Sequence, residues 1–281
     1  ANATATVNVT IITAPEAGTI GTRTVCSSDA AFNLLTELGG TPDASGAWTD
    51  PLAQAFSGTF VPGTSAAGVY TYTVAGIAPC LNDVSTATIT VSQAANVGTN
   101  GSLTICSDDA PVVLFGSLGG TPNTGGTWTR PGGGPFAGTY DPANPAHPAG
   151  IYTYTVTPTA PCGVLSSTVQ VVENQAPKAG TDGTITVCST NAPFNLITAL
   201  GGGPDLNGSW LGPTLLAVPS TFTPGTSSPG LYRYVVAGTA PCENDTAFVT
   251  VVVNTAPSAG TNGSLSICSD ASFVNLFTLL G

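Results

Sequence analysis

Apolar and polar residues alternate along several short stretches of the chain, and this pattern predicts β-strands. Within residues 86–91, Ala87, Ile89 and Val91 alternate with threonines. A period of two places one set of side chains on a buried face and the other in solvent. Residues 70–74 and 247–253 repeat this pattern. No segment has a sustained period of 3.6, so residues 32–38 are the only candidate for a helical turn.

Turn signals separate these strands at regular intervals. Leu-Gly-Gly closes an apolar run at residues 38–40, 118–120 and 200–202, and a proline follows each time two residues later. Gly and Pro in such positions favour tight turns. About seven short strands in some 80 residues are typical of a small immunoglobulin-like β-sandwich. We therefore predict an all-β fold of this type.

The whole pattern recurs along the chain. The first cysteines of successive copies lie at nearly constant intervals, and Trp, paired Tyr and later Cys residues recur in the same phase. Self-similarity of this kind indicates tandem repeats. We expect repeats at 19–98, 99–180 and 181–260, with residues 1–18 as the last strand of a preceding repeat and 261–281 as the start of a following one. The in-phase residues are Cys26, Cys106, Cys188 and Cys268; Trp48, Trp128 and Trp210; Tyr70, Tyr72, Tyr152, Tyr154, Tyr232 and Tyr234; and Cys80, Cys162 and Cys242.

The joints between repeats are short. They occupy residues 14–18, 94–98, 176–180 and 256–260, and none contains a long Gly/Ser run. Short joints of this composition leave little freedom between neighbours. We therefore expect the repeats to lie end to end as a rod, each adding very roughly 35–40 Å.

The cysteines indicate disulfides and an oxidising, extracellular setting. Two pairings fit the spacing. Bridges across the joints would have the same separation every time, whereas bridges within repeats would have a longer separation in the second repeat than in the others. A bridge needs Cα atoms within about 7 Å. Residues in successive domains of a rod are usually much farther apart than this, which favours bridges within repeats. The expected pairs are Cys26–Cys80, Cys106–Cys162 and Cys188–Cys242, and the partner of Cys268 would then lie beyond Gly281.

The aromatic residues are candidates for a core or for sugar binding. Trp48, Trp128 and Trp210 each follow a glycine by two residues. A core Trp packed near a disulfide is the favoured interpretation, and stacking platforms for glycans are the alternative. Tyr70, Tyr152 and Tyr232 share one strand face with a second tyrosine, and we expect them in the core as well.

Charge and composition exclude several classes of function. The chain has 4 Lys+Arg against 15 Asp+Glu, for a formal net charge of -11, the opposite of a nucleic-acid binder. No apolar run approaches the ~18 residues of a membrane-spanning helix. The only histidine, His147, lies in a Pro-rich loop where we expect it to be solvated, and no Cys-x-x-Cys is present. We therefore predict no enzyme activity and no cofactor.

Calcium is the one metal that the sequence leaves open. Acidic residues follow the first cysteines, and carboxylates are ligands that calcium prefers. The favoured interpretation is turn and capping chemistry, because Asp and Ser accept hydrogen bonds from nearby backbone amides. The residues concerned are Asp29, Asp108, Asp109 and Asp270.

The repeat resembles one found in very large secreted surface proteins of the Bacteroidetes, which are associated with gliding motility, PKD-like domains and type IX secretion. The resemblance spans essentially the whole chain and rests on Cys-Ser, Leu-Gly-Gly, Gly-x-Trp, Gly-x-Tyr-x-Tyr and Ala-Pro-Cys, as in AGTDGTITVCSTNAPFNLITALGG from Ala179. It implies an exported protein at the bacterial cell surface with a stalk or adhesive role.

Four functions are consistent with these observations. The favoured one is the structural stalk of a cell-surface adhesin, whose partners are flanking repeats, other copies of the protein, surface glycans or other cells. The alternatives are a subunit of a self-assembling extracellular filament or sheath, an array of glycan-binding repeats, and a spacer attached to a secreted hydrolase.

Overall fold

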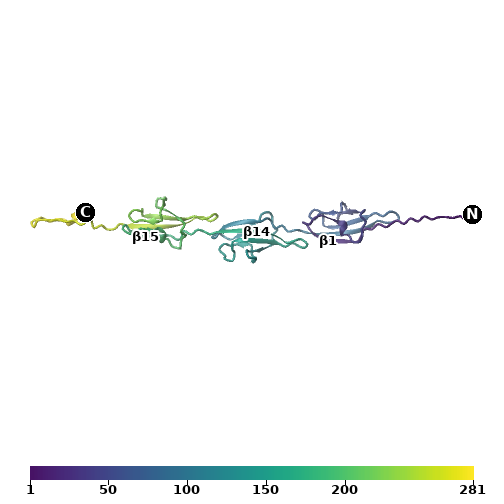
Figure 1. Ribbon diagram of the computed structural model, residues 1–281, viewed down its shortest axis with the longest axis horizontal. Coiled ribbons are helices and arrows are strands. Elements are labelled where there is room, and N and C mark those ends of the chain that lie inside the picture. Colours follow the sequence, from purple (N-terminus) through teal and green to yellow (C-terminus); the bar gives the residue numbers. More distant parts are fainter. The chain divides into compact units, whose positions relative to one another are not determined.

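The computed structural model describes residues 1–281 and contains β-strands, turns and 3-10 helices but no α-helix (Figure 1). The short helices are η1 (Leu34–Glu37), η2 (Leu114–Ser117), η3 (Leu196–Ala199) and η4 (Leu276–Leu279). The first of them is the helical turn expected within 32–38, and the Asn33 side chain caps it by accepting from the Leu35 amide. The predicted all-β class is confirmed.

Three sets of seven strands follow one another along the chain. The first set is β1 (Gly21–Cys26), β2 (Phe32–Asn33), β3 (Ala47–Thr49), β4 (Ala55–Phe56), β5 (Thr59–Phe60), β6 (Gly68–Val74) and β7 (Asp83–Ser92). The second is β8 (Gly101–Cys106), β9 (Val112–Val113), β10 (Thr127–Thr129), β11 (Pro135–Phe136), β12 (Thr139–Tyr140), β13 (Gly150–Val156) and β14 (Leu165–Asn174). The third is β15 (Gly183–Cys188), β16 (Phe194–Asn195), β17 (Ser209–Leu211), β18 (Ala217–Val218), β19 (Thr221–Phe222), β20 (Gly230–Val236) and β21 (Asp245–Asn254).

Each set forms a five-stranded and a two-stranded sheet. The first has the order β1-β7-β6-β3-β4 beside β2-β5, and the others repeat it as β11-β10-β13-β14-β8 with β9-β12 and β15-β21-β20-β17-β18 with β16-β19. Strands β1 and β7 pair in parallel, from Gly21 opposite Ala87 to Cys26 opposite Ser92. The remaining pairs of this set are antiparallel. Seven strands in two such sheets form an immunoglobulin-like sandwich, as the sequence predicts.

Aromatic and branched side chains fill the space between the two sheets. Strand β7 buries alternate residues and exposes the others, as its period of two predicts. Burying such side chains stabilises the fold by roughly 1.5–3 kcal/mol each. The buried core of the first sandwich is Ala17, Val25, Leu34, Leu38, Trp48, Phe60, Tyr70, Tyr72, Val74, Ala87 and Ile89. That of the third is Ala179, Val187, Leu196, Leu200, Trp210, Phe222, Tyr232, Tyr234, Val236, Ala247, Val249 and Val251.

The glycine before each tryptophan is explained by the neighbouring tyrosine. A Cβ on Gly46 would overlap the Tyr72 ring, and the Gly46 amide donates to the Tyr72 hydroxyl at 2.8 Å. The ring also stacks at a tilt on Trp48, with 4.8 Å between ring centroids. Only glycine therefore fits beside this Trp–Tyr pair. The same amide–hydroxyl bond recurs in the other two sandwiches.

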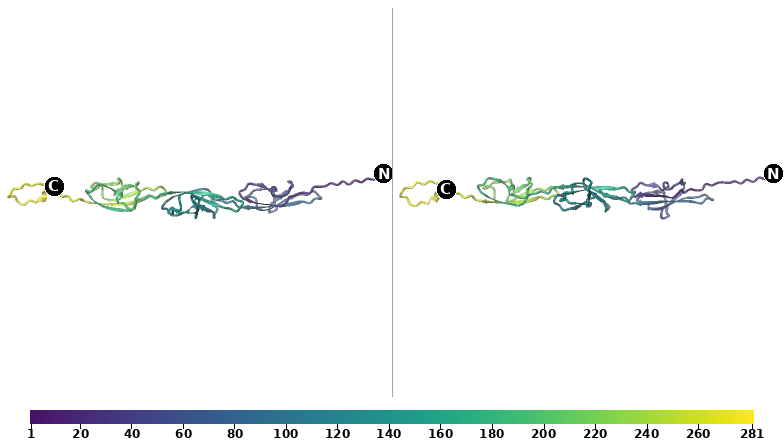
Figure 2. Two further views of the ribbon diagram at one scale, coloured as in Figure 1. Left: turned by 60° about the horizontal axis from the view of Figure 1, so that its bottom comes forward. Right: turned by 90° about the horizontal axis from the view of Figure 1, so that it is seen from below.

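The two ends of the chain form no sheet. Val7, Val9 and Ile11 alternate as a strand would, yet they are 87%, 76% and 91% exposed. Residues 261–281, the yellow loop in both views of Figure 2, contain only the short helix η4 and no strand. The assignment of these ends to flanking repeats stays a prediction, as do the boundaries at 19, 99 and 181.

The chain divides into two compact units. The first comprises residues 1–103 with 111–172, and the second comprises residues 104–110 with 173–281. Residues 104–110 include Cys106, whose disulfide partner Cys242 belongs to the same unit. None of the short helical turns has the length and apolarity that a membrane-crossing helix requires.

Candidate functional site: the junctions between repeats

The later cysteine of each repeat lies on the hairpin loop before the longest strand. This Ala-Pro-Cys loop connects β6 to β7, β13 to β14 and β20 to β21. In all three loops the Ala–Pro peptide bond is cis. The cysteine amide closes a turn, as when Cys162 donates to the Thr159 carbonyl at 3.2 Å. The loop therefore presents its cysteine at the end of the sandwich where the next long strand begins.

The two disulfides join cysteines of consecutive repeats. Cys26 is bonded to Cys162, with 4.9 Å between Cα atoms. Cys106 is bonded to Cys242, with 5.0 Å between Cα atoms. Both bridges span 136 residues of sequence, so each connects the first cysteine of one repeat to the later cysteine of the next.

The predicted pairing within repeats is therefore wrong, and the strand register gives the reason. Cys26 ends β1, which runs parallel to β7, and it lies opposite Ser92 at the last position of β7. Cys80 precedes Asp83, the first residue of β7. A strand of 10 residues spans about 33 Å, whereas a disulfide allows its Cα atoms at most about 7 Å. Pairing across a joint, Cys80 with Cys106, is not formed either, since Cys106 bonds Cys242.

Hydrogen bonds surround each bridge. In the first junction the Ser92 hydroxyl donates to the Ala160 carbonyl at 3.0 Å, and the Cys162 sulfur lies 3.3 Å from the Ser92 carbonyl oxygen. In the second junction the Asn174 amide group donates to the Ala240 carbonyl at 2.7 Å. The end of one long strand thus holds the Ala-Pro-Cys loop of the following repeat.

A serine next to the first cysteine anchors the joint from one side. The Ser27 hydroxyl accepts from the Ala94 amide at 2.9 Å, and the Ser107 hydroxyl accepts from the Ala176 amide at the same distance. The Ser27 amide also donates to the Ser92 carbonyl at 2.9 Å. The Cys-Ser motif therefore combines two tasks, because the cysteine bonds the next repeat and the serine fixes the joint.

A turn residue of the following repeat holds the joint from the other side. Asn123 accepts from the Asn96 amide through its side chain at 2.6 Å and donates its own amide to the Asn96 carbonyl at 2.7 Å. Asp205 makes the same pair of bonds with Lys178. The Tyr154 hydroxyl donates to the Asn123 carbonyl at 2.6 Å. The aromatic core is thereby connected to the joint by hydrogen bonds.

The acidic residues considered for calcium serve the turns at the bridges. The Asp29 carboxylate accepts from the Cys26 amide, and the Asp109 carboxylate from the Cys106 amide, both at 2.8 Å. These are the local bonds that Asp favours in turns. Asp108 lies near the sulfur atoms of Cys106 and Cys242. Those sulfurs are bonded to each other, so they are not thiolates that could ligate a metal.

Three cysteines are not bonded within this chain. These are Cys80, Cys188 and Cys268. The expected bridges of Cys80 with Cys26 and of Cys188 with Cys242 are therefore not formed. The Cys80 sulfur lies 3.7 Å from the Ile12 carbonyl, much as Cys162 lies beside Ser92. The Thr190 hydroxyl donates to the Cys188 sulfur at 3.5 Å, and this bond lowers the pKa of the thiol.

The aromatic candidates for sugar binding lie inside the sandwiches. Trp48, Trp128 and Trp210 are 7%, 8% and 4% exposed, so their faces are unavailable as stacking platforms. His147 is half-buried rather than solvated, since its ring packs edge-on against Phe136 with centroids 5.2 Å apart. The prediction for His147 is therefore wrong. Tyr70, Tyr152 and Tyr232 are 1%, 0% and 4% exposed.

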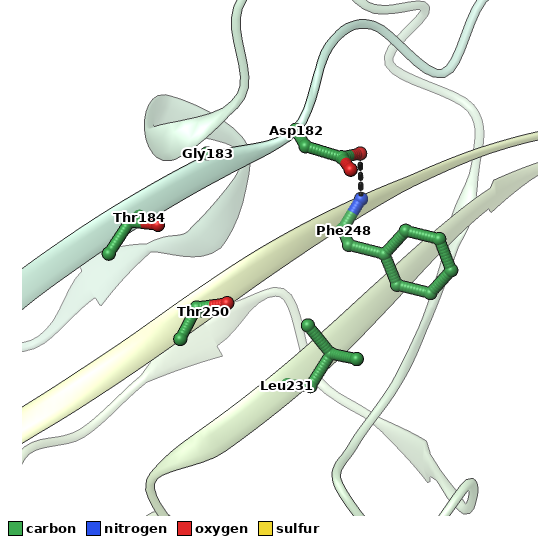
Figure 3. Close-up of a pocket in the computed structure, with 6 residues that line it drawn as sticks. All are labelled: Asp182, Gly183, Thr184, Leu231, Phe248 and Thr250. Carbon is green, nitrogen blue, oxygen red and sulfur yellow. Dashed lines mark hydrogen bonds between the residues drawn. The ribbon is translucent and has the colours of Figure 1, made fainter.

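An open groove lies on the outer face of the third sandwich (Figure 3). The Asp182 carboxylate accepts from the Phe248 amide at 2.8 Å, and Leu231 and Thr250 form the adjoining surface. Asn100 accepts from the Thr168 amide at the equivalent place. The carboxylate therefore bonds to β21 just before the paired part of β15 begins, and the groove contains no converging set of polar groups that would define a ligand.

The chain is similar to several solved structures at low sequence identity. No protein-family model and no curated protein matches the chain. A three-domain fragment of the titin I-band is 13% identical, with 87% of this chain and 98% of that chain covered and a TM-score of 0.44. Extracellular domains 3–5 of Drosophila OTK are 15% identical, with 87% of this chain and 97% of that chain covered and a TM-score of 0.37. The insect immune protein hemolin is 15% identical, with 87% of this chain and 76% of that chain covered and a TM-score of 0.35. The fold assignment rests on the strand order and register described above, and these define a tandem immunoglobulin-like repeat region.

Proposed function

We propose that this chain is the structural repeat region, or stalk, of a large secreted adhesin at a bacterial cell surface. The observation that supports it most is the junction, where each disulfide joins two consecutive repeats and hydrogen bonds hold the joint on both sides. Such junctions resist separation of neighbouring repeats, which suits a stalk that projects a binding end. The proposed arrangement is an end-to-end rod.

Two further features agree with an extracellular stalk. Structural disulfides persist in oxidising compartments outside the cytosol. The chain has only 4 Lys+Arg among 281 residues, which leaves few sites for trypsin-like proteases. The resemblance of the repeat motif extends the proposal to the Bacteroidetes surface proteins, with export by type IX secretion and a role in gliding or adhesion.

Antibody labelling of intact cells tests this proposal. An antibody against residues 181–260 should label unpermeabilised cells that make the protein, and brief treatment with a broad-specificity protease should remove the label. Mass per length of the labelled structures should then correspond to one chain. Labelling that requires permeabilisation would contradict a surface stalk, and a mass per length of several chains would establish the filament instead.

A further inference from the structure

The two disulfides close loops that overlap along the sequence. One loop runs from Cys26 to Cys162 and the other from Cys106 to Cys242. Residues 107–161 therefore belong to both loops. Bridges within repeats would instead close separate loops, each confined to one repeat. Overlap matters for tension along the chain, because a pull is carried by the shortest covalent route and the residues outside that route stay slack.

We propose that these disulfides make the repeats into two interleaved covalent load paths. In an array, each path would consist of strand–joint–strand segments, such as residues 162–188, joined end to end by disulfides. The rest of each sandwich would carry no tension after a local unfolding event. This inference gives the proposed stalk its mechanical basis, but its test does not depend on where the protein is located.

Cys80 and Cys188 are each half of a further bridge of the same kind, whose other cysteine would belong to an adjoining repeat. We call these two positions half-sites. The Cys80 sulfur lies 3.7 Å from the Ile12 carbonyl, and the bonded Cys162 and Cys242 lie 3.3 Å and 3.4 Å from the equivalent carbonyls. Cys188 lies opposite Asn254, just as the bonded Cys26 lies opposite Ser92. Both half-sites therefore have the arrangement found at the completed bridges.

A bridge at Cys188 would form by thiol–disulfide exchange. Its thiolate attacks a small-molecule disulfide, and the cysteine of the adjoining repeat then attacks the mixed disulfide. Two protein thiols lose two electrons and two protons in total, and the oxidant leaves as two thiols. The lowered pKa of Cys188 raises the thiolate fraction that starts this exchange.

The spacing of the cysteines supports load-bearing segments of fixed length. The segments 80–106, 162–188 and 242–268 are equally long, whereas the stretch from first to later cysteine is longer in the second repeat than in the first and third. The extra residues of the second repeat lie between Trp128 and Tyr152, off the proposed path. Parallel load paths need segments of equal length, because a longer one would stay slack while its neighbour bore the force.

These segments also have little slack to release. Of residues 162–188, strand β14 takes 10 and strand β15 takes 6, and strands are already close to full extension at ~3.3 Å per residue. The full contour of such a segment is roughly 90 Å. Tension on an array would therefore meet nearly straight backbone and sulfur–sulfur bonds.

Single-molecule pulling of the full chain by its two ends tests the overlap of the loops. The background variant has Cys80→Ser, Cys188→Ser and Cys268→Ser, which prevents disulfide exchange. Fully extended, this variant should have a contour length equal to about 120 residues, roughly 400 Å, because the shortest covalent route between its ends passes through both bridges. Adding Cys26→Ser should lengthen it by only about 24 residues. Adding Cys26→Ser and Cys106→Ser together should lengthen it to about 280 residues, roughly 950 Å.

This marked non-additivity is the signature of interleaved paths. If bridges form within repeats, the background retains only Cys106–Cys162, extends to about 224 residues and does not respond to Cys26→Ser; that result overturns the proposal. Ser28→Ala, in the same turn as Cys26, is the matched control and should leave the length unchanged. Peptide mapping without reductant must find Cys26–Cys162 and Cys106–Cys242 in the background, and any other pairing also overturns the proposal.

Discussion

The interior of a repeat and the junction between repeats are stabilised by different interactions. Inside the sandwich, large aromatic side chains such as Trp48 and Tyr70 are almost fully buried, and their apolar burial dominates. At the junction the connections are a disulfide and bonds to backbone amides and carbonyls. The interior therefore resists unfolding of a repeat, whereas the junction resists separation of two repeats.

This difference explains which positions are the same in all three repeats. The core requires particular side chains, so a Trp and two Tyr recur in each. At the joint, one backbone amide is bonded to a turn side chain of the following sandwich. The bonded pairs are Glu16 with Asp43, Asn96 with Asn123, and Lys178 with Asp205. The side chains of the three joint residues differ in charge because only their backbone atoms make the contact.

Removing a core tryptophan should have the largest effect on stability. Trp128→Ala deletes a side chain that is 8% exposed, and truncations of this kind cost ~3–5 kcal/mol through lost burial and the cavity that remains. Urea denaturation followed by circular dichroism should show an early transition for the second sandwich. The control is Leu52→Ala, at a position 77% exposed, which should change stability by less than about 0.5 kcal/mol. A loss below about 1 kcal/mol for Trp128→Ala would contradict the interior half of the comparison.

Opening one bridge should have the next largest effect. Cys162→Ser releases a closed loop of 136 residues, and disulfides typically contribute ~2–4 kcal/mol by restricting the unfolded chain. Differential scanning calorimetry should show lower stability of the unit that contains residues 1–103 and 111–172, with the other unit's transition unchanged. Cys80→Ser is the matched control, because Cys80 is not bonded in this chain. Equal losses for the two variants would show that the bridge at Cys162 is not the cause.

The interior follows from the sequence because its physics is local and repetitive. The period of two in residues 86–91 and the Gly-x-Trp motif each determine a strand and its buried face, and the in-phase Trp and Tyr residues then indicate one core per repeat. A Cβ on Gly46 would overlap the Tyr72 ring, so even the glycine follows from the tyrosine.

The pairing of the junction cysteines could not be derived in the same way. The expectation that cysteines of one repeat lie closer in space than cysteines of neighbouring repeats favours Cys26–Cys80, but the parallel register of β1 on β7 separates these residues by the length of a strand. That register depends on the packing of the whole sandwich and not on a local pattern. The constant length of the segments 80–106, 162–188 and 242–268 was the available signal, since it indicates that the strand–joint–strand segment is fixed. It does not by itself identify the bonded pair.

A single hydrogen bond at the joint should have a smaller effect. Ser107→Ala removes the acceptor for the Ala176 amide at 2.9 Å and for the Gln175 side chain at 3.0 Å. The expected loss is about 1 kcal/mol, the net contribution of a typical hydrogen bond. Hydrogen exchange of the Ala176 amide should become faster while core amides are unaffected. Ser102→Ala, on an exposed strand position, is the control, and faster exchange in both variants would argue against a specific anchor.

The smallest effect on stability should be the pH dependence that a buried core tyrosine causes at high pH. Burial, with a contribution from the Asp50 carboxylate, raises the pKa of Tyr70, and burial likewise raises the pKa of Tyr232. The folded chain therefore holds these protons more tightly than the unfolded chain, in which tyrosine titrates near ~10. Their contribution to stability is complete below that value and is lost as pH rises through the raised pKa of the folded state.

Tyr70→Phe should therefore reduce the loss of stability with rising pH, although it also removes the hydroxyl that donates to the Ala66 carbonyl at 2.8 Å. Urea denaturation at a series of pH values above about 9 should give a shallower decline for Tyr70→Phe than for the unchanged chain. Near neutral pH the variant should be less stable by about 1 kcal/mol, the value of one hydrogen bond. Tyr232→Phe should act in the same way on the third sandwich, which makes the two variants controls for each other. If neither variant alters the alkaline slope, the titrating groups that limit stability lie at the junctions, and the division between interior and junction would have to be redrawn.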